Sequence, residues 1–188
     1  RIAKAIALSL LLVSFGVFLV YQYRSIRHPY QLDYGEATIL DQALRLSNGE
    51  NIYRNQMEEP PYSVSNYPPV YIAALVPWLK MFGPSFTFGR VLSALCALWT
   101  AIVIARFLWK QTSDVLPAIA GGLLFLSIPF VVHWSSLVRI DLLALAFSVT
   151  GLTVLSEWPL SRKRLWTGAA FLVFAIYTRQ SYIFAAPL

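Results

Sequence analysis

Several apolar stretches of about 20 residues constrain the fold of this 188-residue chain more than any other feature. A bilayer core of roughly 30 Å needs about 20 apolar residues for each helical span. The chain is 57% hydrophobic, only 13% of its residues are charged, and its mean hydropathy is +0.59. The sequence therefore predicts an all-α, polytopic transmembrane helix bundle rather than a water-soluble domain.

The charges and the single cysteine exclude other classes of protein. The formal net charge is +6, which would suggest nucleic-acid binding in a soluble protein. Here the basic residues lie at the ends of apolar spans, where they set orientation and reach toward the headgroups, so we predict no nucleic-acid partner. Cys96 lies inside an apolar run, which favours a small core residue and excludes a disulfide framework.

Five apolar segments are predicted to cross a membrane. Val70 to Phe82 is too short to cross, contains Pro77, and is predicted to be interfacial or re-entrant. The most basic short loop, Ser161 to Arg164, should lie in the cytoplasm with the N-terminus. The predicted localisation is the plasma or bacterial inner membrane. The five spans are Ile2 to Tyr23, Val91 to Trp109, Val115 to Val132, Leu142 to Trp158, and a last one that starts near Leu165.

The chain is expected to be a single transmembrane domain, residues 1–188, forming the N-terminal half of a longer protein. Residues 24–90 are predicted to be an external loop with interfacial helices. Glu36 to Leu46 has apolar residues at 37, 40, 43 and 44 with Asp41, Gln42 and Arg45 opposite, which is helical spacing. We expect a short surface helix that ends at Asn48-Gly49.

The predicted topology brings most of the chemically interesting side chains to the external side. Six of the nine acidic residues lie between Arg24 and Pro69. If Val70 to Phe82 does not cross, the number of spans also places the later polar residues on that side. The external set is Asp33, Glu36, His133, Arg139, Asp141 and Arg179.

Each of these residues also has a purely structural interpretation. Asp33 and Glu36 have the spacing of a capping box, which is compatible with an exposed carboxylate that the cap holds in place. Arg139 and Asp141 could simply pair at the interface, although an ionisable residue at the lip of a span is a functional candidate. Arg179 could extend to the headgroups, and His133 is more often an interfacial hydrogen-bonding residue than a metal ligand. His28 is a weaker candidate still.

The order of the motifs resembles the glycosyltransferase C superfamily, in particular bacterial enzymes similar to protein O-mannosyltransferases (glycosyltransferase family 39) and to the aminoarabinose transferase of lipid A. The matching segments cover essentially the whole chain, but relatives often have Lys in the last of them. The segments are Asp33-Tyr-Gly-Glu36, Leu46-Ser-Asn-Gly-Glu-Asn-Ile-Tyr53, Tyr67-Pro-Pro-Val-Tyr71, Phe82-Gly-Pro-Ser-Phe-Thr-Phe-Gly-Arg90, Arg139-Ile-Asp141 and Thr178-Arg179-Gln180.

The resemblance implies an inverting enzyme that transfers a sugar from a polyprenyl-phosphate carrier to an acceptor hydroxyl at the external face. Asp33 is then the candidate base, and Glu36 would orient the acceptor or Asp33. Arg179 would neutralise the leaving phosphate, with Arg139 as the second candidate for this role. Asp141 would orient Arg139 or join Asp33 at a divalent metal, whose use stays open. Gln180 and Tyr67 complete the implied substrate-binding set.

A different class of function also fits the sequence. The chain could be a non-catalytic transmembrane subunit, a truncated relative that packs against other subunits in a larger membrane complex. The family also has further spans, which this chain lacks, so activity of the chain alone is in doubt. The partners that we expect are therefore the bilayer, a lipid-linked sugar donor and, under the alternative, other membrane subunits.

Overall fold

All the regular elements in the described part of the chain are helices, as the apolar runs predict. The computed structural model describes residues 2–54, 58, 60 and 62–185. The helices are α1 (Ile2–Arg27), α2 (Tyr34–Ser47), α3 (Pro69–Phe82), α4 (Phe86–Thr112), α5 (Val115–Ser127), α6 (Pro129–Trp134), α7 (Asp141–Ser156), α8 (Arg162–Thr178) and the 3-10 helix η1 (Gln180–Ala185).

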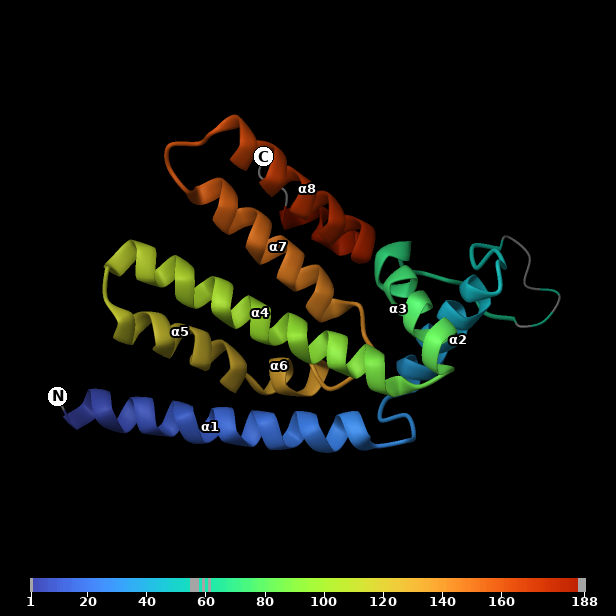
Figure 1. Ribbon diagram of the computed structural model, residues 1–188, viewed down its shortest axis with the longest axis horizontal. Coiled ribbons are helices and arrows are strands. Elements are labelled where there is room, and N and C mark those ends of the chain that lie inside the picture. Colours follow the sequence, from blue (N-terminus) through green and yellow to red (C-terminus); the bar gives the residue numbers. More distant parts are fainter. Residues whose placement is uncertain (1, 55–57, 59, 61, 186–188) are drawn as a thin grey trace.

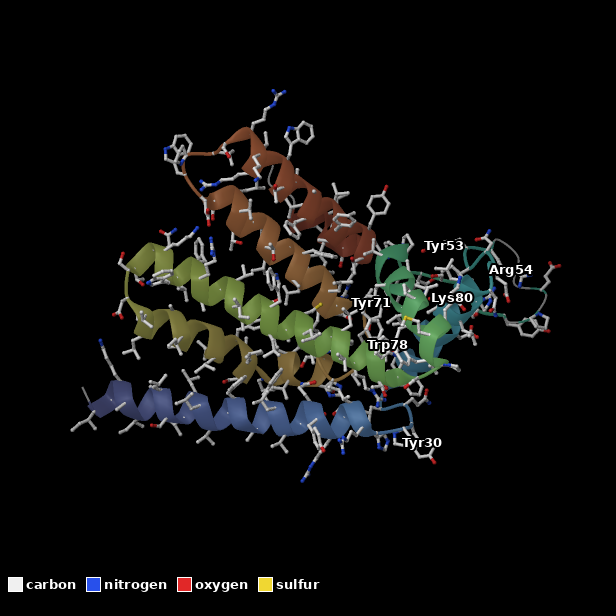
Figure 2. All side chains as sticks on the ribbon, in the orientation of Figure 1. Tyr30, Tyr53, Arg54, Tyr71, Trp78 and Lys80 are labelled. Atoms are coloured by element: carbon white, nitrogen blue, oxygen red, sulfur yellow. The ribbon has the colours of Figure 1, made fainter. Side chains whose placement is uncertain are left out.

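The long helices form a bundle with two distinct ends (Figure 1). Helices α1, α4, α5, α7 and α8 run side by side, with contacts between α1 and α5, α4 and α5, α4 and α7, and α7 and α8. Helices α2 and α3 pack on each other beyond the right-hand end of the bundle, as Figure 1 shows. Figure 2 places Tyr30 at the turn after α1, at this same end. We call it the α2–α3 end and the opposite one the far end.

Within the described residues, two helices are long and apolar enough to cross a membrane by their length and composition. They are α1 and α4, with 26 and 27 residues. Only 6% of the most apolar window of α1 is buried against the rest of the chain, compared with 33% for α4. Most of the apolar surface of α1 therefore has no partner within the described residues.

One predicted span is interrupted. The segment Val115 to Val132 was expected to be one helix, but the structure divides it into α5 and α6 at Ile128, whose ψ of 122° is extended. Pro129 is the physical reason, because proline disfavours the helical conformation of the residue before it and has no N–H to donate. Pro129 then begins α6, a position that suits proline. The prediction of a continuous helix here was wrong.

The helix predicted at Glu36 to Leu46 is present as α2, but its buried face differs from the expected one. Its Asn48-Gly49 end is confirmed, and Gly49 has a positive φ of 80°. Gln42 and Arg45, expected on the solvent face, are buried, whereas Leu44 is exposed. The reason is that residues after α2 supply polar partners: Ser65 Oγ lies 3.2 Å from Gln42 Oε1 and Glu50 Oε2 lies 3.0 Å from Arg45 Nε.

Helices α7 and α8 approach each other closely at two glycines. A Cβ atom added to Gly151 would lie 3.0 Å from the carbonyl oxygen of Gly168, and one added to Gly168 would lie 2.5 Å from Leu155 Cγ. Because neither glycine has a side chain, the two backbones can pack together without an intervening layer. This crossing fixes how α8 lies on α7.

Candidate active site

A buried ion pair between Glu36 of α2 and Arg90 of α4 holds the α2–α3 end together. Both side chains have no exposed surface, and Arg90 Nη2 lies 2.8 Å from Glu36 Oε2. Arg90 Nε donates to Glu36 Oε1 at 2.9 Å. Its Nη atoms also donate to backbone carbonyls in the last turn of α1 and just after it: Ser25 at 2.7 Å, His28 at 2.6 Å and Tyr30 at 2.7 Å. One guanidinium therefore connects α4, α2 and the end of α1.

Glu36 also accepts backbone hydrogen bonds from two other segments. The amide of Leu32 donates at 2.6 Å, that of Asp33 at 3.4 Å and that of Val138 at 2.8 Å. Burial raises the pKa of Glu36, but the hydrogen bonds from Arg90, Leu32 and Val138 outweigh it and hold that pKa below its usual value of 4.5. Of the two roles expected for Glu36, this buried position favours orienting the Asp33 segment over touching an acceptor.

Asp33 is the N-cap of α2, as its spacing to Glu36 predicts. Its Oδ1 accepts a hydrogen bond from the Gly35 amide at 3.0 Å, and the reciprocal capping box with Glu36 is formed. Arg139 Nη1 lies 3.4 Å from the same Oδ1 atom, and 22% of the Asp33 side chain is exposed. The Gly35 amide and Arg139 thus both approach the same oxygen, Oδ1, of this carboxylate.

Arg139 and Arg179 both contact Asp141. Because Arg139 also contacts Asp33, these four charged residues form one chain. Arg139 Nε lies 3.9 Å from Asp141 Oδ2, and Arg179 Nη1 pairs with Asp141 Oδ1. The Arg139 and Asp141 side chains are only 11% and 12% exposed, whereas that of Arg179 is 39% exposed. The order Asp33, Arg139, Asp141, Arg179 alternates negative and positive charge from the start of α2 to the end of α8.

Aromatic rings and a glycine fix the position of Arg139. Its guanidinium carbon lies 4.5 Å from the centre of the Trp134 ring and 5.9 Å from that of Tyr34. On another side it lies directly against Gly35, where a Cβ atom would overlap Nη1. The first turn of α2 can therefore receive the guanidinium only because residue 35 has no side chain.

The arrangement of Asp33 and Asp141 does not fit a divalent cation between them. The Arg139 guanidinium contacts both carboxylates, and Arg179 contacts the second one. A cation there would meet this positive charge at short range. Among the described residues, no group of three or more His, Cys, Asp or Glu side chains could hold a metal.

Two pockets open beside this chain of charges, and Tyr67 lines both. The first has a volume of about 230 Å³ and the second about 290 Å³. Gly35 and Arg139, which both contact the Asp33 carboxylate, line the first, and Arg179 and Gln180 line the second. The full lining of the first is Tyr34, Gly35, Thr38, Ile39, Gln42, Val64, Asn66, Tyr67 and Arg139, and that of the second is Tyr67, Arg179, Gln180, Ser181 and Phe184.

A third, largely apolar pocket of about 330 Å³ adjoins the second through Tyr67 and Gln180. Gln180 also donates to the carbonyl oxygen of Asn66 at 3.0 Å, which ties η1 to the segment before α3. The walls of this third pocket come mainly from the segment before α3 and from the end of α8. The lining residues are Tyr53, Ser65, Asn66, Tyr67, Pro68, Pro69, Ile176, Tyr177 and Gln180.

The structure brings together all seven of the candidate site residues at the α2–α3 end. Glu36 is buried, and Tyr67, Arg139, Arg179 and Gln180 line the pockets. Asp33 and Asp141 line none of these three pockets and are joined to them through Arg139 and Arg179. Neither histidine forms an ion pair with this chain of charges among the described residues. His133 is exposed on α6, where its ring meets Trp134 edge-on, and His28 meets Tyr30 edge-on. Cys96 is buried in α4, as its apolar surroundings predict.

Arg90 is the important residue that we did not include among the candidates. It lies in the first turns of an apolar helix, and an ionisable residue there needs a partner, so a signal was present. What could not be read from the sequence is the identity of the partner, because Glu36 precedes Arg90 by 54 positions.

Comparisons with known proteins do not assign the chain to a family. No protein family, no curated protein and no solved structure matches the chain significantly.

Proposed function

We propose that this chain is the catalytic part of an integral membrane glycosyltransferase, which transfers a sugar from a polyprenyl-phosphate carrier to an acceptor hydroxyl with inversion. The observation that supports this most is the chain Asp33, Arg139, Asp141, Arg179 beside adjoining polar and apolar pockets at one end of an apolar bundle. A carboxylate, a cation and an apolar groove are the three features that a lipid-phosphate sugar donor and a hydroxyl acceptor require.

In the proposed membrane arrangement, α1, α4, α5 with α6, α7 and α8 are the five spans. Helix α3 is 14 residues long, about 21 Å at ~1.5 Å per residue, and it packs on α2 beyond the end of the bundle formed by the five spans. Helices α2 and α3 would therefore lie at the external interface. The far end carries Lys4, Arg106, Lys110 and residues 162–164, which the positive-inside rule assigns to the cytoplasm.

The proposed reaction begins with the acceptor in the pocket lined by Gly35 and Arg139. Asp33 Oδ1 is held by the Gly35 amide and Arg139, so Oδ2 takes the proton from the acceptor hydroxyl. The acceptor oxygen forms a bond to the anomeric carbon as the bond from that carbon to the phosphate oxygen breaks. The bonding electron pair leaves with the polyprenyl phosphate.

Arg179 is the proposed partner of the leaving phosphate. It is the most exposed cation of the charged chain and lines the pocket next to the apolar one. A guanidinium stabilises the charge that develops on a phosphate oxygen as the bond breaks. Asp141 holds Arg179 and Arg139 and is a positioning residue, and the apolar pocket would receive the first units of the polyprenyl chain.

Replacement of Asp33 by Asn tests the proposed base. Asn is about as good an N-cap as Asp, so the free energy of unfolding should change by less than ~1 kcal/mol. Loss of the proton acceptor should lower the rate of transfer by about 100- to 10,000-fold. The measurement is transfer of radiolabelled sugar from a panel of polyprenyl-phosphate sugars by the purified protein in nanodiscs.

Asp41→Asn is the matched control, because Asp41 is on the same helix and exposed. It should leave the rate unchanged. Near-normal transfer by Asp33→Asn would reduce Asp33 to a helix cap. A folded parent protein that transfers no sugar from any donor would instead support the non-catalytic subunit.

A further inference from the structure

A second groove lies on the side of the bundle between α4 and α7, toward the far end and away from the candidate active site. Its volume is about 420 Å³. Trp99 and Thr150 line its end nearer the middle of α4, where the indole N–H donates to the Thr150 hydroxyl at 3.0 Å. This bond satisfies the indole donor, so this end presents an apolar wall. The lining residues are Trp99, Ile102, Val103, Arg106, Phe107, Thr150, Thr153, Val154, Glu157 and Arg164.

The mouth of the groove has a surplus of positive charge. Glu157 pairs with Lys110, and Arg164 Nη2 lies 3.5 Å from Glu157 Oε2. Arg106 lines the groove together with Glu157 and Arg164. Three cations therefore surround one anion, and the exposed Arg106 contacts no acidic side chain among the described residues within salt-bridge distance.

The length of the groove fits one leaflet of a bilayer. The lining residues on α4 run from Trp99 to Phe107, 8 residues or about 12 Å at ~1.5 Å per residue, which lies within the ~15 Å of half a bilayer core. Trp99 and Ile102, at 51% and 60% exposed, open the groove sideways onto the apolar surface of the bundle. An occupant with an apolar chain could therefore enter from the lipid phase.

We propose that this groove binds an anionic phospholipid of the same leaflet, with its phosphate at Arg106 and Arg164 and one acyl chain along Ile102, Val103 and Phe107. A guanidinium group can bind a phosphate through two parallel N–H···O hydrogen bonds. Basic pockets between membrane helices suit anionic headgroups. The surplus of positive charge distinguishes this occupant from a zwitterionic lipid. This inference rests on the proposed membrane insertion and is independent of the proposed sugar transfer.

The test is native mass spectrometry of the detergent-solubilised protein, titrated with phosphatidylglycerol or with phosphatidylcholine of identical acyl chains. The wild-type protein should bind the first more tightly. Arg106→Gln should reduce that preference by about fivefold, the effect of one basic residue near an anionic headgroup. Val154→Phe adds volume inside the groove without a change in charge and should weaken binding of both lipids.

Arg162→Gln is the matched control, because it removes one positive charge at the same end from a residue that does not line the groove. It should leave the preference intact. Equal losses in Arg106→Gln and Arg162→Gln, no headgroup preference in the wild type, or no effect of Val154→Phe would each overturn the proposal. So would tight binding of free glycerol phosphate, or selective binding of a polyprenyl phosphate in place of phosphatidylglycerol. Because the readout is lipid binding, loss of sugar transfer in a separate assay would not affect it.

Discussion

Gly35 shows how a single missing side chain shapes the candidate site. The Arg139 guanidinium lies where a Cβ atom of residue 35 would be, between the first turn of α2 and the Asp33 carboxylate. Arg139 is a long side chain whose end can move, so a methyl group at residue 35 would shift the guanidinium rather than the backbone. The geometry of the charged chain therefore depends on this glycine.

Gly35→Ala should separate activity from stability. Alanine is favoured over glycine within a helix by about 0.5–1 kcal/mol, so the melting temperature should hold or rise slightly. Displacement of Arg139 by about 1 Å should lower sugar transfer by about 100-fold. Transfer assays and thermal unfolding of both proteins check this, with Gly16→Ala as the control, since no atom lies within 4 Å of a Cβ atom at Gly16. Unchanged transfer in Gly35→Ala would show that the position of Arg139 is unimportant.

At the scale of residues, the sequence predicts which residues belong to the site better than it predicts what those residues contact. The capping box of Asp33 and Glu36 follows from local spacing, and the structure confirms it. The partner of Arg90 and the contact of Arg139 with Gly35 join segments that are far apart in the chain. Local propensity contains no information on such pairs, so burial of the Glu36 carboxylate could not be predicted.

At the scale of elements, the Glu36–Arg90 pair joins α1, α2 and α4. Removal of one partner of a buried ion pair leaves the other charge without compensation in a low-dielectric environment. Glu36 in addition holds the amide of Val138, just before Arg139. The Glu36 carboxylate therefore stabilises the fold and also fixes the backbone next to Arg139.

Glu36→Gln should destabilise the protein by about 3–5 kcal/mol. The matched Glu50→Gln change breaks the Arg45–Glu50 pair, in which Arg45 is 9% exposed but the carboxylate is 53% exposed. It should cost less than Glu36→Gln, because water screens this carboxylate. The pKa of Glu36 is lowered in the folded state, so its contribution is complete above the usual value of 4.5 and is lost as the pH falls through the lower folded-state value.

Thermal unfolding of the solubilised proteins between neutral pH and about pH 3 measures both effects. The gap between wild type and Glu36→Gln should be widest at neutral pH and should narrow in acid. Equal melting temperatures for Glu36→Gln and Glu50→Gln at neutral pH would contradict a stabilising role for the buried pair.

The apolar periodicity predicted where helices occur, but not every boundary or face. Four of the five expected spans correspond to single helices. Pro129 divides the remaining one, Val115 to Val132, into α5 and α6. In α2, the polar partners Ser65 and Glu50 allow Gln42 and Arg45 to be buried. A hydrophobicity pattern assigns polar residues to solvent and cannot anticipate partners that a later segment supplies.

At the scale of the whole molecule, the two ends of the bundle differ in charge and in the cavities that they hold. The α2–α3 end has the alternating chain of Asp33, Arg139, Asp141 and Arg179. The far end has an excess of basic residues. The predicted number of crossings and this asymmetry of charge lead to the same proposed orientation, with the candidate site outside.

Cysteine labelling in intact cells checks the orientation. In a Cys96→Ala background, Asn48→Cys should react with a membrane-impermeant thiol reagent, because Asn48 is exposed at the end of α2. Ser161→Cys, exposed at the far end, should react only after the membrane is permeabilised. The reverse pattern would invert the proposed topology and place the charged chain in the cytoplasm.

Helices α7 and α8 cross in close contact at Gly151 and Gly168, so a change in the crossing angle would rotate α8 about Gly168. Arg179 lies 11 positions after Gly168, about 16 Å along the helix at ~1.5 Å per residue. A tilt of about 4° at the crossing would therefore move the start of the Arg179 side chain by roughly 1 Å. Asp141 is mounted on α7 and would not follow that movement, so the angle at which two backbones cross near the far end of the bundle sets the spacing of charges at the other end.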